Sequence, residues 1–423
     1  MCCMNSRYGY RSVFFLRGVG NEVVLCVSTL MLTARGLSLS EIAWMLTLGF
    51  ATTTLLEVPS GVIGDLWGRK RLWILSVLCS LGWLIACLSG VRVLIVFGAV
   101  LNGVGVALGS GTIDALYVEQ WREHYGKERL ARAGMWSTLF TYLGFAAGAV
   151  ISGALPRVWG SAVDYTLHLT VSAVIFAVML CIGCKMIPDA VRKNRPVKRS
   201  FGKSCLQVVL QLRKTARLAK RRRLLGLVLG AAVIMGFSTV GVQLYWQPRL
   251  EALASPEQLS WALAVCSFFS MAMLALSSVG AAAVLERVHS TEKKVLVYAA
   301  YRFAMIGVMA WMAFAMQAFW FGVLYILYYI FMGGQDAVDA VLLHESVPNR
   351  QRGTMLSVQS LALRFGGMVS QSLCGLLLLK VHMMHVWLFL AAAHAIGFGV
   401  CLLAFRAKKG GRTGVSQNMR STS

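Results

Sequence analysis

Long apolar segments recur along the chain and are separated by short polar loops. A helix of roughly 20 residues is needed to cross the hydrocarbon core of a bilayer, which is about 30 Å thick. The apolar segments reach that length in two sets of six. They lie at about 11–33, 42–63, 72–91, 94–117, 132–155 and 163–187, and at about 224–247, 260–284, 295–315, 319–341, 354–379 and 384–406. The pattern predicts an all-α membrane protein with twelve transmembrane helices in two six-helix bundles.

The longest polar stretch separates the two sets and defines the expected domains. We expect an N-terminal bundle at 1–187, a basic cytoplasmic linker at 188–223, a C-terminal bundle at 224–408 and a cytoplasmic tail at 409–423. The linker segment from Lys203 to Arg223 places apolar residues near one helical face and cations on the other. Such a helix can lie on an anionic leaflet, and a solvated tether is the alternative interpretation.

Composition and charge agree with a membrane protein. The AVILMFWYC set makes up 57% of the chain, 14% is charged and the mean hydropathy is +0.67, whereas soluble domains are about 25% charged. If the N-terminus is inside, the cytoplasmic segments hold 33 Lys and Arg and the outer loops hold 5. Positive charge concentrates on the cytoplasmic side of membrane proteins. We therefore expect both termini to be cytoplasmic, and the net charge of +24 does not indicate nucleic-acid binding.

Motifs for covalent or metal chemistry are not found in the sequence. It contains no Walker A loop, no nucleophile elbow and no HExxH, and we expect no cofactor, no metal and no enzymatic activity. The cysteines inside apolar segments are interpreted as small buried hydrophobes; they are Cys79, Cys87, Cys181, Cys266, Cys374 and Cys401.

The two halves share a weak internal repeat. At an offset of 220, the segment Arg132 to Phe145 matches the segment Arg352 to Phe365 at positions that include Arg132, Met135, Ser137 and Phe145. At an offset of 222, Gly111 and Asp114 match Gly333 and Asp336. These matches fall in corresponding helices and favour a parallel duplication with a pathway between the bundles.

The sharpest motif follows the second predicted helix, in the segment GVIGDLWGRKRL. Glycines there allow a tight turn, and the cations can hold anionic headgroups or a partner carboxylate. Gly61, Asp65, Gly68, Arg69 and Lys70 match a Gly-x-x-x-Asp-x-x-Gly-Arg-Lys/Arg pattern, and the chain here resembles the major facilitator superfamily. The resemblance implies that these residues gate a conformational change and do not bind substrate. The corresponding loop from Gly280 has lost the Asp and the second Gly.

The fifth predicted helix carries small residues at Gly144, Gly148 and Gly153. This spacing allows close helix packing. It also resembles the helix 5 motif of the superfamily's twelve-helix drug:proton antiporters, with Ala149 in place of Pro. The Arg that those antiporters carry on helix 4 aligns near Ala99, so proton coupling through that Arg is not available here.

Charged residues inside the membrane need a partner or a wet cavity. The resemblance implies that helices 1, 4, 7 and 10 line the pathway. The candidates for proton coupling are Glu22, Arg17, Glu57, Asp114 and Asp336. Asp114 and Asp336 lie near the cytoplasmic boundary, where a structural role is the alternative. Arg17 and Glu22 are five residues apart and do not share a helical face, and Asp114 is a candidate partner for Arg17.

Polar and aromatic residues cluster on two predicted pathway helices. Aromatic residues near an interface commonly anchor a helix in the headgroup region, and on a pathway they can stack on flat or cationic compounds. The substrate-binding candidates are Gln243, Tyr245, Trp246, Gln247, Tyr325 and Tyr329.

The sequence thus predicts a secondary active transporter that works by alternating access, with proton-coupled efflux of small amphipathic or drug-like compounds as the leading hypothesis. A nutrient or metabolite proton symporter is the alternative. A non-transporting receptor or lipid scramblase is an alternative of another class. The expected partners are a small-molecule substrate, protons and anionic lipids, for a monomer in a bacterial cell membrane.

Overall fold

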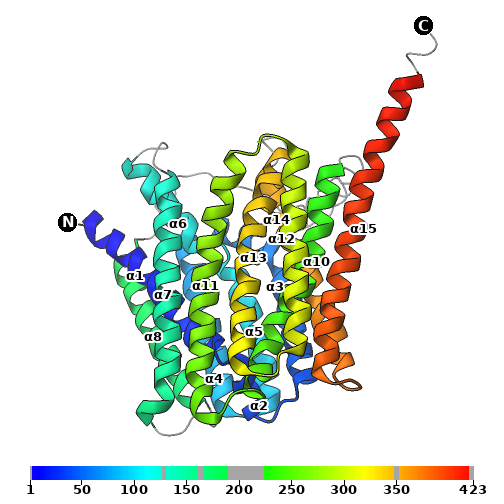
Figure 1. The fold of residues 1–423 in the computed structure, drawn as a ribbon. Coiled ribbons are helices and arrows are strands. Elements are labelled where there is room, and N and C mark those ends of the chain that lie inside the picture. The colour runs from blue at the N-terminus through cyan, green and yellow to red at the C-terminus, as the bar shows by residue number, and fades with distance from the viewer. Residues whose placement is uncertain (1, 126–129, 160–164, 189–222, 347–351, 419–423) are drawn as a thin grey trace. The chain divides into compact units, whose positions relative to one another are not determined.

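The computed structural model describes residues 2–125, 130–159, 165–188, 223–346 and 352–418, and every regular element in these ranges is a helix. The helices are α1 (Cys2–Leu25), α2 (Ser28–Ala34), α3 (Leu39–Trp67), α4 (Arg69–Ser89), α5 (Arg92–Gly109), α6 (Thr112–Tyr125), α7 (Leu130–Trp159), α8 (Thr166–Met186), α10 (Arg223–Glu251), α11 (Pro256–Glu286), α12 (Thr291–Phe314), α13 (Ala318–Ser346), α14 (Arg352–Leu377) and α15 (Met383–Asn418) (Figure 1).

Most of these helices are suited to a bilayer. In the described ranges, ten segments are long and apolar enough to cross a membrane, and the bent pair α1 and α2 makes up to eleven. The remaining predicted span coincides with α14, a helix of 26 residues whose Gln359, Arg364 and Gln371 make it more polar. The all-helical membrane fold is confirmed, and the protein is a multi-pass membrane protein.

Two predicted spans are interrupted. The first window contains α1 and α2, which are bent by 48° relative to each other at Cys26 and Val27. The fourth contains α5 and α6, separated at Ser110 and Gly111. Gly111 has a φ of +68°, a conformation that glycine adopts without steric penalty. The sequence explains this second break, but no Gly or Pro marks the first one.

The described contacts divide the chain into two units. Unit 1 contains Met1–Gln207 and Gln247–Ala272, and unit 2 contains Val208–Trp246 and Met273–Ser423. Unit 1 therefore includes the end of α10 and the first part of α11. The four domains derived from the sequence stay a prediction, and residues 189–222 of the expected linker lie outside the described residues.

Glycines bring matching helices together within each unit. In unit 1, a Cβ on Gly144 of α7 would lie 3.0 Å from the Cα of Gly18 in α1. In unit 2, a Cβ on Gly366 of α14 would overlap the backbone of α10 at Val233. Such close backbone approach requires small residues. Since α7 and α14 are the helices matched by the sequence repeat, the same kind of contact recurs in both halves of the duplication.

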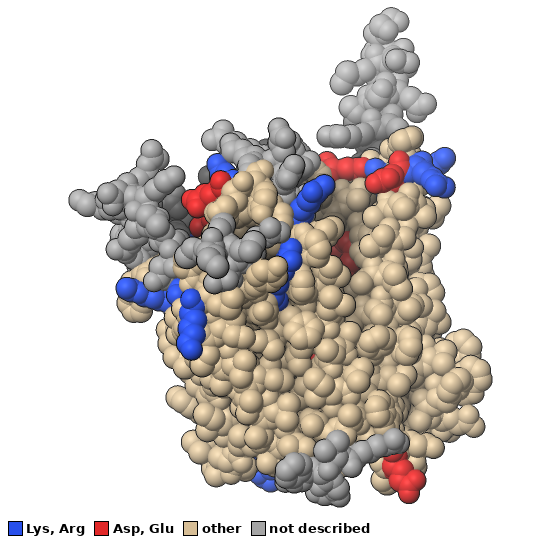
Figure 2. All heavy atoms as spheres, turned by 90° about the vertical axis from the view of Figure 1, so that its left-hand side faces the viewer, with Lys and Arg blue, Asp and Glu red and all other residues tan. Residues whose placement is uncertain are grey.

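Charged side chains gather near the two ends of the visible face. Figure 2 shows Lys, Arg, Asp and Glu toward its upper and lower parts, with a broad area between them that is almost free of charge. This distribution suits a surface that contacts lipid tails in its middle and water at its ends.

One expectation about the cysteines is wrong. Of the six cysteines expected to be buried hydrophobes, Cys181 is exposed on α8 and Cys401 is only half-buried on α15. Together with Cys184, Cys181 forms a Cys-x-x-Cys pair, and both thiols are free and exposed. An exposed thiol facing lipid is compatible with a membrane segment, which is why the apolar context misled the interpretation.

Candidate transport site

The motif from Gly61 to Lys70 spans the end of α3 and the start of α4. It is described in part. Gly61 and Asp65 lie in α3, but their surroundings fall outside the described part of the structure. Gly68 separates α3 from α4 with a φ of +95°, which strongly favours glycine. Arg69 Nη1 donates to Glu119 Oε1 of α6 at 2.7 Å, and Lys70 Nζ donates to the carbonyl of Cys184 in α8 at 3.0 Å. The cations of the motif thus connect the start of α4 to two other helices of unit 1.

Glu22 is a buried carboxylate in the last turn of α1. Its residue exposure is 1%, and Ser267 Oγ of α11 donates to Glu22 Oε1 at 2.6 Å. The other carboxylate oxygen, Oε2, is buried and has no hydrogen-bond partner among the described residues. Gly148 of α7 packs directly on it, since a Cβ there would lie 2.7 Å from the Glu22 Cβ. A proton on Oε2 would leave the Ser267 bond intact.

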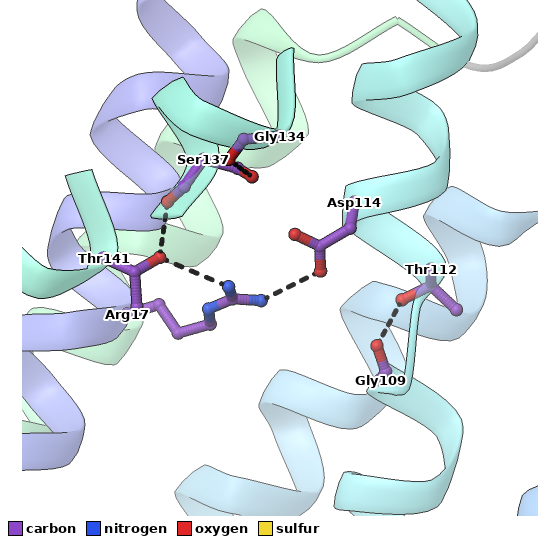
Figure 3. A network of polar contacts seen from close by, with 7 residues as sticks. All are labelled: Arg17, Gly109, Thr112, Asp114, Gly134, Ser137 and Thr141. Atoms are coloured by element: carbon purple, nitrogen blue, oxygen red, sulfur yellow. Dashed lines mark hydrogen bonds and ion pairs between the residues drawn. The ribbon is translucent and has the colours of Figure 1, made fainter. Parts of the chain in front are cut away.

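Arg17 contacts Asp114 and not Glu22. Its Nη1 lies 3.4 Å from Asp114 Oδ2, and its Nη2 donates to Thr141 Oγ1 of α7 at 3.4 Å (Figure 3). The side chains of Arg17 and Asp114 are 30% and 42% exposed. Figure 3 shows Asp114 reaching from α6 toward Arg17 on α1. The structure thus pairs Arg17 with the carboxylate considered for it, at a partly exposed place.

The other two proton-coupling candidates lie on other helices, α3 and α13. Glu57 is half-buried in α3, and its backbone carbonyl accepts a hydrogen bond from Ser60 Oγ at 2.8 Å. Asp336 belongs to unit 2, has an exposed side chain and accepts a bond from Gln335 Nε2 at 3.2 Å.

The glycines of α7 serve packing. Gly144 contacts α1 at Gly18, Gly148 contacts α1 at Glu22, and Gly153 contacts α11, where a Cβ would lie 2.6 Å from that of Ala264. These contacts bring α1 and α11 against one helix and place Glu22 beside a small residue.

The aromatic candidates form a buried stack in unit 2. The rings of Trp246 and Tyr325 are stacked with centroids 4.6 Å apart and an interplanar angle of 20°. Tyr325 also contacts Tyr329, with centroids 5.0 Å apart. Tyr245, the residue before Trp246, is fully buried. Its hydroxyl has no hydrogen-bond partner among the described residues. Because these rings are buried, they do not lie on the lipid-facing surface where headgroup anchors are found.

The two glutamine candidates have different surroundings. Gln243 is exposed on α10. Gln247 is buried, and both ends of its amide bond to the backbone at the break between α1 and α2: Nε2 donates to the Leu25 carbonyl at 2.7 Å, and Oε1 accepts from the Thr29 N–H at 2.8 Å. These contacts give Gln247 a structural role in this conformation.

Unit 2 contains a buried polar network that was not found from the sequence. Arg302 of α12 is 0% exposed, and its Nη2 donates to the Tyr298 hydroxyl at 2.7 Å. That hydroxyl donates to Asp339 Oδ1 at 2.8 Å, and Gln359 Nε2 of α14 donates to Asp339 Oδ2 at 2.9 Å. The guanidinium therefore reaches a carboxylate through a tyrosine.

The same guanidinium also contacts a histidine. Arg302 Nη1 lies 3.2 Å from His394 Nε2 of α15, and His394 Nδ1 lies 2.7 Å from Ser238 Oγ of α10. Arginine only donates hydrogen bonds, so Nε2 accepts and Nδ1 carries the proton donated to Ser238. The cation also lies over the rings of Tyr298 and Phe398, at 4.7 and 5.0 Å. A buried Arg with such partners has much of its desolvation cost offset.

These observations describe a multi-pass helical membrane protein with a buried carboxylate, Glu22, in its first span. The family model of the Major Facilitator Superfamily matches residues 12–371, and the chain belongs to this superfamily. It is a secondary transporter of small molecules and not an enzyme.

Solved structures share the fold over nearly the whole chain. The nucleoside transporter NupG is 12% identical with a TM-score of 0.73, covering 96% of this chain and 99% of that one. A POT family transporter in complex with 5-aminolevulinic acid is 11% identical with a TM-score of 0.69, covering 93% and 95%. A bacterial homolog of the human lysosomal transporter Spinster is 14% identical with a TM-score of 0.62, covering 96% and 94%. None of the curated proteins matches the sequence.

Proposed function

We propose that the protein exports small amphipathic or drug-like compounds in exchange for protons. It acts as a monomer in a bacterial cell membrane, with both termini cytoplasmic and its basic segments on anionic lipids. The observation that carries the proposal is the half-bonded carboxylate of Glu22. One oxygen is held by Ser267 and the other has no partner in the described structure, so a proton can be bound and released without rebuilding the surroundings.

One such carboxylate suffices energetically. A proton that moves down a potential of 100 mV supplies about 2.3 kcal/mol, enough for roughly a 50-fold substrate gradient. Arg17 of α1 and Asp114 of α6 form a partly exposed ion pair. Glu57 and Asp336 are secondary candidates for the coupling group.

We place substrate contact at the aromatic cluster of unit 2. Trp246 stacks on Tyr325, and Tyr325 contacts Tyr329 at a tilted angle. A flat amphipathic compound can replace one of these ring contacts. Trp246→Ala and Tyr329→Ala should each change the range of exported compounds or the apparent affinity, measured by transport in vesicles. Unchanged range and affinity in both variants would leave these rings a packing role only.

We further propose that the motif after α3 gates the cycle. Asp65→Asn should impair transport severely while insertion and abundance stay near normal, because it changes the balance between inward-open and outward-open states. Transport at the wild-type rate would contradict the gate.

The competing proposal is proton-coupled uptake of a nutrient or metabolite. It is favoured by Ala99, which stands where the antiporters carry their helix 4 Arg, and by structural neighbours named for nucleosides and a POT ligand. Export is favoured by the α7 glycines. The two are separated in inside-out vesicles with an imposed pH gradient. Uptake of a test compound into these vesicles that a protonophore abolishes supports export, whereas uptake of a labelled metabolite by energised intact cells supports import.

A further inference from the structure

The break in the first span leaves backbone groups without helical partners. The last carbonyls of α1 and the first N–H groups of α2 have no partner of their own in the helices, and such groups are costly in a membrane when they are not bonded. No glycine or proline lies between Leu25 and Thr29, so the local sequence does not by itself favour the 48° bend. Something outside the span must stabilise it.

Gln247 supplies both missing bonds. Its amide donates to the Leu25 carbonyl at 2.7 Å and accepts from the Thr29 N–H at 2.8 Å, so one side chain bridges the two sides of the break. The residue is 1% exposed. A primary amide is suited to this task because it carries a donor and an acceptor together.

The bridge lies one turn beyond Glu22. Leu25 is three residues after Glu22 on α1, and Gln247 belongs to the same segment of unit 1, Gln247–Ala272, as Ser267. This one segment therefore holds both the carboxylate and the break that follows it. If the segment separates from α1, both contacts are lost together.

We propose that Gln247 is a positioning residue that stabilises the broken first span and keeps its outer end closed. The inference rests on the proposed transport cycle and topology, but it does not depend on Glu22 being the coupling group. In the outward-open state the amide bonds to Leu25 and Thr29 are broken, and the break becomes accessible to water.

A natural reporter lies inside the break. Cys26 is 1% exposed in this conformation. Its labelling by a membrane-impermeant maleimide, applied to right-side-out vesicles and quantified by mass spectrometry of its peptide, measures how often the outer end opens. Cys87, which is also fully buried in unit 1, reports loss of folding in the same sample.

Gln247→Leu keeps the approximate volume and removes both bonds. Each bond contributes a factor of roughly 2–12 to the closed state, and we expect Cys26 labelling to rise by about tenfold or more while Cys87 labelling stays unchanged. The matched control is Gln243→Leu, one turn earlier on α10 with an exposed side chain, which should leave both rates at wild type.

Three outcomes overturn the proposal. Unchanged Cys26 labelling in Gln247→Leu shows that the amide does not control opening, and a parallel rise at Cys26 and Cys87 shows that it only supports the fold. Labelling that appears only in inside-out vesicles refutes the topology and with it the outer placement of the break. Loss of transport in Glu22 variants leaves this assay unaffected, so failure of the proposed coupling site is distinguished from failure of the positioning role.

Discussion

The two units differ in how completely their buried charged side chains are hydrogen-bonded. In unit 1, Glu22 has one hydrogen bond from Ser267 and a second oxygen without a partner in the described residues. In unit 2, Arg302 contacts Tyr298 and His394 and reaches Asp339 through the tyrosine. A well-bonded buried ion stabilises one arrangement of helices, whereas a sparsely bonded acid can change its protonation state with little rearrangement. On this difference we base the proposal that unit 1 exchanges the proton, and we expect the Arg302 network to act as a fixed framework in unit 2.

The largest expected effect on stability concerns the framework. Arg302→Met should lower the free energy of unfolding by about 3–5 kcal/mol, because it removes one member of a buried network and leaves the others unpaired. Unfolding by a denaturing detergent in mixed micelles measures this loss. Arg287→Met is the control, since Arg287 is exposed and should change stability by no more than about 0.5 kcal/mol. Equal stability of the two variants would refute the framework role.

A smaller effect is expected where glycines join helices in both units. Gly144→Ala and Gly366→Ala place a Cβ against a neighbouring backbone and should each destabilise by about 1–3 kcal/mol. Gly134→Ala is the control on α7, because nothing lies within 4 Å of its Cβ position. That change should be neutral or stabilise by up to about 1 kcal/mol through helix propensity. The same unfolding assay compares all three, and a loss confined to one unit would argue against equivalent packing in the two halves.

The smallest effect on the free energy of unfolding is expected at the partly exposed ion pair of Arg17 and Asp114. Arg17 and Asp114 are 30% and 42% exposed, and such pairs contribute about 0–1 kcal/mol. Arg17→Gln, Asp114→Asn and the double variant form a cycle whose coupling energy in the unfolding assay should stay within that range. A coupling above about 2 kcal/mol would mean that this pair is as structural as the Arg302 network.

The sequence predicted the helical membrane fold because hydrophobic length alone determines which segments enter a bilayer. It also identified Glu22 and Arg17 as intramembrane charges, because charged residues are rare within apolar segments and are therefore easily recognised. Their partners could not be predicted, because Ser267 lies 245 residues from Glu22 and a lone serine in an apolar helix carries no signal. His394 and Tyr298 were missed for the same reason.

The break after Leu25 shows a further limit of the sequence. Breaks are expected where Gly or Pro occurs, as at Gly111, but here the bonds across the break come from the side chain of Gln247, 222 residues from Leu25. From the sequence, Gln247 is a substrate-binding candidate, because polar residues at the end of a pathway helix suggest a binding site. Only the tertiary contacts show that its amide is bonded to backbone.

The most direct test of the assignment of proton exchange to unit 1 is substrate-induced proton release in proteoliposomes. Glu22→Gln preserves the volume of the side chain and an acceptor for Ser267 but cannot exchange the proton. We expect this variant to bind substrate and allow downhill exchange without releasing protons, while Glu57→Gln, measured beside it, releases them as the wild type does. Proton release that persists in Glu22→Gln and disappears in Glu57→Gln would place the coupling group on α3 and contradict the account.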